Sequence, residues 1–478
     1  MPFNREEDFE NALIEMLSKK GWEKNVIRHP SEKDLLQNWA DILFDNNNTI
    51  DRLNGARLTE DEMRQLVDQI STLRTPQMLN GFINGRTVSI RRENPADILH
   101  YGKEISLKIF DPHEIAAGQS RYQIVKQPHF KAPSNIFPQR RGDLLLLING
   151  MPVIHIELKK SGIPVSQAYN QIEKYSREGI FSGIFQLIQI FVAMNPEETV
   201  YFANPGPDGR FNKDFYFHWA DFNNVPQNDW KDIATYLLSI PMAHQLIGYY
   251  TIADRTDGVL KVLRSYQYFA VRAIYDKVTK RQDWKSTDHQ LGGYIWHTTG
   301  SGKTMSSFKA AQLIADSGKA DKVIFVIDRI ELGTQSAREY RNFSAEDEAI
   351  QETENTDALV GKMKSPDVAD TLIVSSIQKL GIMAEEGNIR PVDLKKINQK
   401  RIVFIVDECH RSTFGETFQQ IKATFPTAMF FGFTGTPIQD ENQRHQSTTT
   451  DILAMNCIDT VSLMEYVTAM FWALTLTK

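Results

Sequence analysis

The sequence predicts an α/β protein with more than one domain, and three observations support that prediction. The chain has 478 residues, which at roughly 150 residues per domain suggests about three domains. It is 41% hydrophobic and 24% charged, so most of it should fold around buried cores. Beyond residue 290, short aliphatic runs alternate with amphipathic segments, the pattern of a parallel sheet covered by helices.

Charge and cysteine content exclude several classes of protein. The chain has 54 Lys and Arg against 60 Asp and Glu, a net charge of −6, which excludes a small basic DNA-binding module but allows a basic groove. Cys409 and Cys457 are too few for a disulfide framework or a clustered zinc site. The first residues are polar, and no apolar run reaches about 18 residues. We therefore expect a soluble, cytoplasmic protein that has no contact with a membrane.

The first half of the chain begins with helices and continues with strands. A helix is predicted over 6–20, because Phe9, Leu13, Met16 and Leu17 share one helical face and Gly21 can end it. A second helix is expected near 60–73. The next elements are predicted from apolar runs and turn signals: strands at 144–148, 152–159 and 187–193, a helix at 165–178, and a surface loop at 203–214.

We place a domain boundary near residue 250, within 245–260. The predicted elements beyond it alternate in type, as in a parallel sheet: strands at 293–296, 322–327, 371–375, 402–406 and 428–433, and a helix at 303–316. The segment 344–357 carries six acidic and no basic residues, and we expect it to be a solvated loop.

A glycine-rich loop lies between the strand at 293–296 and the helix at 303–316. Gly300, Ser301 and Gly302 let backbone amides turn toward a phosphate, and the helix adds its positive N-terminal end. Lys303 would reach the β- and γ-phosphates, and the Thr304 hydroxyl would bind magnesium. His297 stands where the usual pattern has its first glycine.

Two acidic residues follow the buried strand at 402–406. Asp407 at the carboxyl end of that strand would bind the magnesium ion, and Glu408 would orient the attacking water. Two acids after a strand are more often a helix cap. Their position about 100 residues after the lysine loop favours the catalytic interpretation.

These motifs resemble the first motor lobe of a superfamily 2 helicase or translocase, a RecA-like parallel α/β domain. The resemblance rests on Asp-Glu-Cys-His at 407–410 and Thr-Gly-Thr-Pro at 434–437. It implies that Thr434 and Thr436 couple nucleotide state to movement, and that Gln267 reads adenine through its carboxamide. It also implies ATP contacts at Thr299 and His410.

Asp143, Glu157 and Lys159 form a second constellation on the hairpin at 144–159. Two carboxylates can hold a divalent ion, and a neighbouring lysine can polarise a water molecule. The strand register decides whether they meet. A two-residue turn at 149–150 pairs Asp143 with Ile156, whereas a three-residue loop or an equivalent bulge pairs it with Glu157. The nuclease interpretation requires the second arrangement.

This pattern resembles the PD-(D/E)xK endonuclease fold, and Gln171 with Tyr175 resembles its RecB-like branch. That branch also places an acid on the first helix, for which Glu10 is the best candidate and Glu6 or Glu7 are weaker ones. Between residues 122 and 180 there are eight Lys and Arg against four Asp and Glu, a local charge of 8 − 4 = +4. Such a charge suits a phosphodiester substrate, although a solvated face would look similar.

A PD-(D/E)xK endonuclease-like domain followed by a RecA-like motor lobe resembles the R subunit of type I restriction enzymes, most closely the IC-type subgroup. The resemblance covers roughly residues 5–452 and divides the chain into a nuclease domain (1–250), a motor lobe (251–452) and a tail (453–478). It implies Mg²⁺ and ATP as cofactors, and double-stranded DNA as substrate. It also implies modification and specificity subunits as partners, with S-adenosylmethionine bound only by the modification subunit.

The chain departs from the family after residue 452. Family members continue into a second motor lobe, whose arginines complete the ATP site, so we expect this chain alone to bind nucleotide poorly and not to translocate. The tail can be read as a single-nucleotide frameshift. The last sheet strand should then end at Phe433, and residues 453–478 should be foreign to the fold. Alternatives are a motor or adaptor with an inactive nuclease domain, a non-catalytic truncation product, or another defence nuclease-helicase.

Overall fold

The chain folds into two compact units, and each is described by itself. Unit 1 comprises residues 1–220 and 225–264, and unit 2 comprises residues 221–224 and 265–478. The computed structural model describes residues 2–112, 114, 120–131, 140–207, 209–254, 259–285, 292–297, 301–327, 351–352, 355–385, 387–407, 415–435 and 456–459. No helix in these ranges is long and apolar enough to cross a membrane.

The division between the units lies near residue 264, beyond the expected position at 250. The reason is that β11 (Thr251–Asp254) and β12 (Val259–Val262) pair with each other as an antiparallel ribbon. This ribbon contacts β10 (Thr199–Ala203), α4 (Pro76–Asn84) and α7 (Met242–Gly248) of unit 1. It therefore completes unit 1 rather than opening unit 2.

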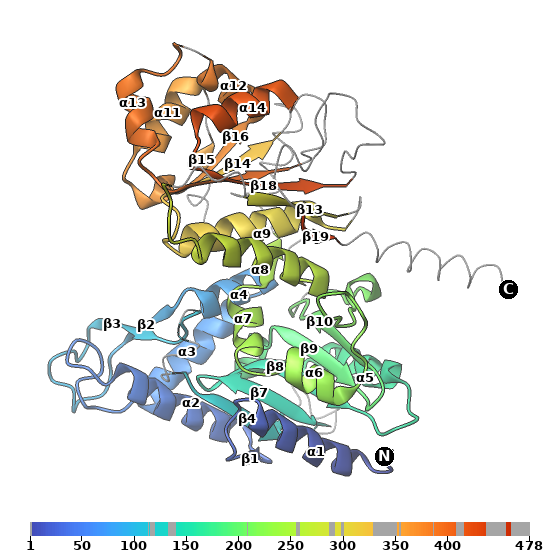
Figure 1. The fold of residues 1–478 in the computed structure, drawn as a ribbon. Coiled ribbons are helices and arrows are strands. Elements are labelled where there is room, and N and C mark those ends of the chain that lie inside the picture. Colours follow the sequence, from blue (N-terminus) through green and yellow to red (C-terminus); the bar gives the residue numbers. More distant parts are fainter. Residues whose placement is uncertain are drawn as a thin grey trace, which may run out of the picture. The chain divides into compact units, whose positions relative to one another are not determined.

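A mixed six-stranded sheet forms the core of unit 1, with its strands in the order β1-β4-β7-β8-β9-β10 (Figure 1). β7 and β8 lie at its centre and are buried along their whole length, which explains why β7 is wholly aliphatic and β8 is apolar except for His155 and Glu157. Besides β10, the strands of this sheet are β1 (Ile27–Arg28), β4 (Tyr122–Lys126), β7 (Leu144–Ile148), β8 (Met151–Leu158) and β9 (Ile190–Met194).

The helices of unit 1 include those expected at 6–20, 60–73 and 165–178. α5 packs on β8, β9 and β10, and α1 contacts β8. A short 3₁₀ helix, Gly183–Leu187, precedes β9, so that strand begins three residues later than predicted. Besides α4 and α7, the α-helices described in unit 1 are α1 (Glu6–Lys19), α2 (Glu32–Asn47), α3 (Glu60–Thr72), α5 (Val165–Arg177) and α6 (Trp230–Tyr236).

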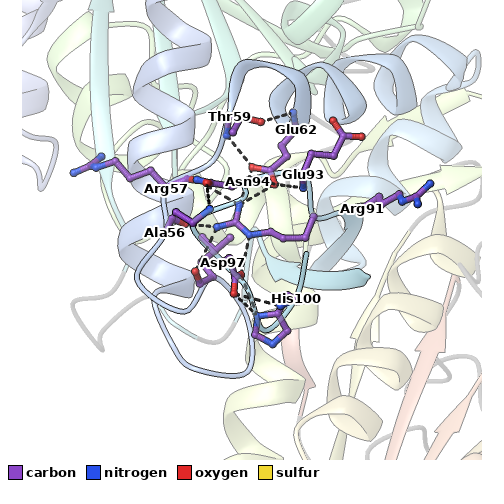
Figure 2. Close-up of polar contacts among 12 residues, drawn as sticks. Ala56, Arg57, Thr59, Glu62, Arg91, Glu93, Asn94, Asp97 and His100 are labelled. Carbon is purple, nitrogen blue, oxygen red and sulfur yellow. Dashed lines mark hydrogen bonds and ion pairs between the residues drawn. The ribbon is translucent and has the colours of Figure 1, made fainter. Parts of the chain in front are cut away.

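A buried ionic cluster holds the loop between β2 (Thr87–Arg91) and β3 (Glu104–Lys108) against α3. The side chains of Arg92, Glu62 and Asp97 are all fully buried. Arg92 donates from Nη1 to Glu62 Oε2 (2.7 Å) and from Nε to Asp97 Oδ2 (3.0 Å). Figure 2 shows how Glu62 and Asp97 converge on this centre from different segments. The cluster fixes the position of the loop that joins the two strands.

Replacing Arg92 by methionine should lower the free energy of unfolding by about 3–5 kcal/mol, because two buried carboxylates would lose their cation. Urea denaturation followed by tryptophan fluorescence measures the loss. Arg91→Met is the matched control: the Arg91 side chain is exposed and points away from the cluster (Figure 2), so this change should alter stability by less than about 0.5 kcal/mol. Equal denaturation midpoints for the two variants would contradict a stabilising role for the cluster.

An all-parallel seven-stranded sheet forms the core of unit 2, in the order β15-β16-β14-β17-β18-β13-β19. This parallel α/β sheet confirms the predicted fold class, and five of its strands lie within one residue of their predicted ranges. The strands are β13 (Gly292–Trp296), β14 (Lys322–Ile327), β15 (Gln351–Glu352), β16 (Leu372–Ser376), β17 (Ile402–Val406), β18 (Met429–Thr434) and β19 (Asn456–Asp459).

Helices cover both faces of this sheet (Figure 1). α8 and α9 pack together on one side, and α11, α12, α13 and α14 gather on the other. α9 begins and ends as predicted. The bounds are α8 (Ser265–Thr279), α9 (Lys303–Asp316), α11 (Thr356–Lys364), α12 (Ile377–Ala384), α13 (Pro391–Ile397) and α14 (Gly415–Thr424).

Two expectations about unit 2 are wrong. The last sheet strand is β19, within the tail, and not the strand ending near Phe433. β19 pairs in parallel with β13 on the side away from β18, where β13 otherwise has a free backbone edge. The acidic segment is not wholly a loop either, because β15 pairs with β16 and α11 starts at Thr356. The other residues of 344–354 and of the tail lie outside the described ranges.

Candidate active sites in the two units

The β7–β8 hairpin brings Asp143 and Glu157 together. Its turn has two residues, Asn149 and Gly150, both with positive φ (52° and 84°), as in a type I′ turn. The register then shifts by one residue between Leu146 and Leu147, and Leu144 pairs with Ile156. Asp143 is therefore opposite Glu157. The equivalent bulge, rather than a three-residue loop, provides the register that the nuclease interpretation requires.

The two carboxylates are desolvated and interact with each other. Glu157 is 1% exposed, and neither of its carboxylate oxygens has a hydrogen-bond partner among the described residues. Burial raises its pKa to about 8. Burial and the charge of Glu157 also raise the pKa of Asp143 well above its usual range, although the Leu158 amide donates to Asp143 Oδ2 (2.7 Å). The pair lacks sufficient compensating positive charge.

Lys159 and an acid of α1 flank this pair. Lys159 Nζ lies 3.8 Å from Glu157 Oε1 and 3.8 Å from Glu6 Oε1, and donates to the Leu158 carbonyl (2.8 Å). Glu10 is buried and binds Lys126 Nζ (3.0 Å), while Gln127 Nε2 donates to the same Glu10 oxygen (3.0 Å). Burial raises the pKa of Glu10. Lys159 lies at the pair, whereas Glu10 interacts directly with Lys126 and Gln127.

Gln171 and Tyr175 of α5 support the backbone next to the site. Gln171 Nε2 donates to the Tyr175 hydroxyl (2.7 Å), which in turn donates to the Arg141 carbonyl (3.2 Å). Burial and the charge of Glu157 raise the pKa of Tyr175. The described hydrogen bonds of both residues therefore reach the backbone carbonyl of Arg141, two residues before Asp143, and not the carboxylates themselves.

His155 belongs to this site, and the sequence interpretation missed it. The ring is fully buried, its Nε2 lies 3.3 Å from Glu157 Oε2, and burial lowers its pKa to about 4, so it is neutral. A Cβ on Gly142 would lie 2.8 Å from its Cε1, so the two residues fit closely. The available signal was its position two residues before Glu157, which puts both side chains on one face of β8.

The donor set of this site fits a small divalent cation. Within the described ranges, no three or more His, Cys, Asp and Glu side chains are grouped to hold a metal. Both Glu157 carboxylate oxygens are nevertheless buried without a hydrogen-bond partner among the described residues, and the desolvated Asp143 carboxylate, whose Oδ2 accepts from the Leu158 amide, lies beside them. Mg²⁺ typically takes one or two carboxylates and completes its shell with water and phosphate oxygens. The pair matches that requirement.

The raised pKa of Glu157 predicts a pH-dependent stability. Its ordinary value is 4.5 and its folded value is about 8, so folding retains a proton that the unfolded chain releases between these values. The contribution of the protonated Glu157 carboxyl to the free energy of unfolding is fully present below pH 4.5 and is lost as the pH rises through about 8. In metal-free buffer, Glu157→Gln should raise Tm by several degrees at about pH 8.5 and little at about pH 5. An equal gain at both pH values in calorimetry would contradict this assignment.

In unit 2, the segment after β13 leads into α9 through a left-handed glycine. Gly302 has a φ of 79° and caps α9, and Lys303 and Thr304 form the first turn of that helix. Ser301 and Lys303 are buried. The loop therefore has the strand-before and helix-after context that phosphate binding requires. Thr299 and Gly300 lie outside the described residues.

Gln267 of α8 supports this loop directly. Its Nε2 donates to the carbonyls of Ser301 (3.2 Å) and Gly302 (3.3 Å), and the residue is 2% exposed. The Tyr266 hydroxyl also donates to the Ser301 carbonyl (2.8 Å), a contact that the sequence interpretation missed. A Cβ on Gly302 would lie 2.5 Å from Gln267 Nε2. The described contacts of Gln267 are therefore with the loop backbone.

Asp407 and Thr434 lie at the same sheet edge as this loop. Asp407 follows β17 and Thr434 ends β18, and β18 lies between β17 and β13 in the parallel sheet. The His297 amide donates to the Thr434 carbonyl (2.8 Å). Because carboxyl ends of parallel strands meet at one edge, Lys303, Thr304 and Asp407 are gathered there. Glu408, His410 and Thr436 lie outside the described residues.

Comparison with known proteins places each unit in a family. Residues 266–468, which include the parallel sheet, match the SWI2/SNF2 ATPase family model. Unit 2 is accordingly a helicase-like ATPase domain. Residues 4–210 match the family model for the type I restriction enzyme R protein N terminus. The order of the two domains is the one the sequence motifs predicted.

Curated relatives match nearly the whole chain. The type I restriction enzyme SsaAORF53P endonuclease subunit of Staphylococcus saprophyticus is 34% identical over 96% of this chain, which spans 46% of that protein. The C-terminal part of the MpnIIP endonuclease subunit of Mycoplasma pneumoniae is 39% identical over 99% of its own length and 43% of this chain. The chain belongs to the family of type I restriction enzyme endonuclease subunits.

The solved structures add little to this assignment. A fragment of an HsdR subunit of a type I restriction enzyme from Vibrio vulnificus is 16% identical to this chain. It covers 70% of this chain and 54% of its own, with a TM-score of 0.28, too low to inform the fold.

Proposed function

We propose that this chain provides the DNA-cleaving and DNA-translocating machinery of a type I restriction-modification enzyme. Unit 1 would cleave double-stranded DNA with Mg²⁺, and unit 2 would bind ATP as the first of the two motor lobes that together move along the DNA. The observation that carries the nuclease part is the desolvated Asp143–Glu157 pair with Lys159 beside it. Type I restriction enzyme endonuclease subunits among the relatives support the same reaction.

Each residue of the nuclease site has a defined role in this proposal. Asp143 and Glu157 would hold the metal ion, which when bound stabilises charge on the phosphodiester and lowers the pKa of a bound water. Lys159 would orient the attacking water and stabilise charge at the phosphate. Gln171 and Tyr175 position the backbone that carries Asp143 through their contact with Arg141.

The ATP site would use the loop before α9 and the ends of β17 and β18. Amides of the loop at 299–302 and the Lys303 ammonium would bind the phosphates. Thr304 and Asp407 would bind Mg²⁺, Glu408 would orient water, and His410 would contact the nucleotide. Gln267 would read adenine or, as its contacts favour, hold the loop. The match to a SWI2/SNF2 ATPase model supports ATP as the nucleotide.

The partners in this proposal are a modification and a specificity subunit, because the relatives carry the names of subunits of type I restriction enzymes. S-adenosylmethionine would enter only through the modification subunit. Co-purification of this chain with both subunits tests the assembly. Failure to associate when all three are expressed together would contradict it.

Incubation with supercoiled plasmid tests the nuclease function. With Mg²⁺ the chain should convert the plasmid to nicked or linear DNA, and a chelator should stop the reaction. Absence of cleavage by the chain together with its partner subunits, or cleavage that persists in excess chelator, would refute the proposal.

A further inference from the structure

An exposed strip of basic and imidazole side chains lies beside the carboxylate pair. Its members are brought together by backbone pairing between three short segments. In the β5 (His129–Phe130) and β6 (Arg140–Arg141) ribbon, His129 pairs with Arg141. The His29 and His129 rings lie 6.3 Å apart, and Arg28 precedes His29 on β1. All four side chains are exposed.

The two arginines of this strip differ from their basic neighbours. Arg140 binds Glu178 through two hydrogen bonds of 2.8 Å, and Arg121 binds Glu23. Lys126, which pairs with Arg28 in register, binds Glu10 (3.0 Å). By contrast, neither Arg28 nor Arg141 has a carboxylate within ion-pair distance in the described part of unit 1. Their charge is available to an anion from outside.

The strip is joined to the carboxylate pair through the backbone. Arg141 is separated from Asp143 only by Gly142, and the Gln127 amide donates to the Asp143 carbonyl (2.7 Å). The Arg141 carbonyl accepts a hydrogen bond from Tyr175, so its position is fixed. Asp143 is half-buried whereas Glu157 is fully buried, so the site opens on the Asp143 side. A phosphate backbone held by the strip would lie at that opening.

We propose that Arg28, His29, His129 and Arg141 form a binding site for the phosphate backbone of duplex DNA, which presents the adjoining phosphodiester to Asp143. This inference rests on the proposed nuclease function and names the residues that hold its substrate. The strip would bind duplex DNA of any sequence, because phosphate contacts fix the position of the protein on the duplex and do not distinguish one base from another.

Salt dependence of DNA binding tests the strip. Binding of a fluorescent duplex to the full chain is measured by anisotropy in chelator, so that no cleavage occurs. Arg28→Gln with Arg141→Gln should weaken binding by about 10-fold at low salt. It should also reduce the slope of log affinity against log salt by about two, one for each phosphate contact. Arg86→Gln with Arg91→Gln is the matched control, because both arginines are exposed and it removes the same charge.

The possible results distinguish failure of the proposed DNA-binding strip from failure of the proposed nuclease function. Loss of affinity and slope in the strip variant alone supports the proposal. If the wild type binds and cleaves DNA but the strip and control variants behave alike, the strip is refuted and the nuclease function stands. If the wild type neither binds nor cleaves duplex DNA, both are refuted.

Discussion

Replacing Glu157 by glutamine is expected to lower Mg²⁺-dependent DNA cleavage by about 10³-fold or more. The neutral amide keeps the shape of the buried side chain but removes one of two negative charges facing the proposed ion. Metal-assisted stabilisation of the transition state is worth several kcal/mol, and each 1.36 kcal/mol is about a factor of ten. Plasmid nicking under single-turnover conditions measures the rate. Asp143→Asn should have a comparable effect.

The control for this experiment is Glu197→Gln, which makes the same change at an exposed position. It should cleave at the wild-type rate. Affinity of Glu157→Gln for duplex DNA in chelator near pH 7 should be unchanged, because a carboxyl group with a pKa of about 8 is already largely protonated when no metal is bound. Cleavage by Glu157→Gln at the wild-type rate would show that the carboxylate pair is not the nuclease centre.

Lys303→Ala is expected to weaken nucleotide binding by about 10- to 100-fold. A charge-assisted hydrogen bond to phosphate is worth about 1.5–3 kcal/mol, which converts to this range. Lys303 begins α9 beside the loop that Gln267 and Tyr266 hold, so the loop should keep its conformation without the ammonium. Titration with a fluorescent ATP analogue in Mg²⁺ measures the affinity.

Lys319→Ala removes an exposed lysine just beyond the other end of α9 and should leave the affinity unchanged. If Lys303→Ala binds the analogue as tightly as the wild type and Lys319→Ala do, the ammonium does not contact the phosphates.

Several strands of unit 2 could be predicted from the sequence because their burial is nearly complete. β14, β17 and β18 lie inside a parallel sheet, so their sequences are nearly continuous apolar runs, as buried strands require. α2 was not predicted, although Ser31 and Asp34 form a capping box at its start and Leu35, Trp39 and Leu43 are buried at helical spacing. That signal was present in the sequence. β19 had none, because a free backbone edge on β13 decides its pairing.

The residues of the candidate sites also differ in how far the sequence could predict them. Asp143, Glu157, Lys159 and Lys303 could be named from motifs, because their chemistry depends on residue type and spacing. The bulge in β8 that brings Asp143 opposite Glu157 could only be stated as a condition, since register is a property of two strands. His155 beside Glu157 and Gln267 beneath the loop are products of tertiary packing, for which the sequence carries little signal.

The close fit of Gly142 and His155 constrains how this site can change over generations. A methyl group at position 142 would meet both the His155 ring and the Phe130 ring at 2.8 Å. Alanine at 142 is therefore tolerated only after both rings have shifted or been replaced by smaller residues, and a change at 142 that comes first passes through a strained intermediate. A survey of natural variants should therefore find a residue larger than glycine at 142 only where positions 130 and 155 both carry smaller side chains.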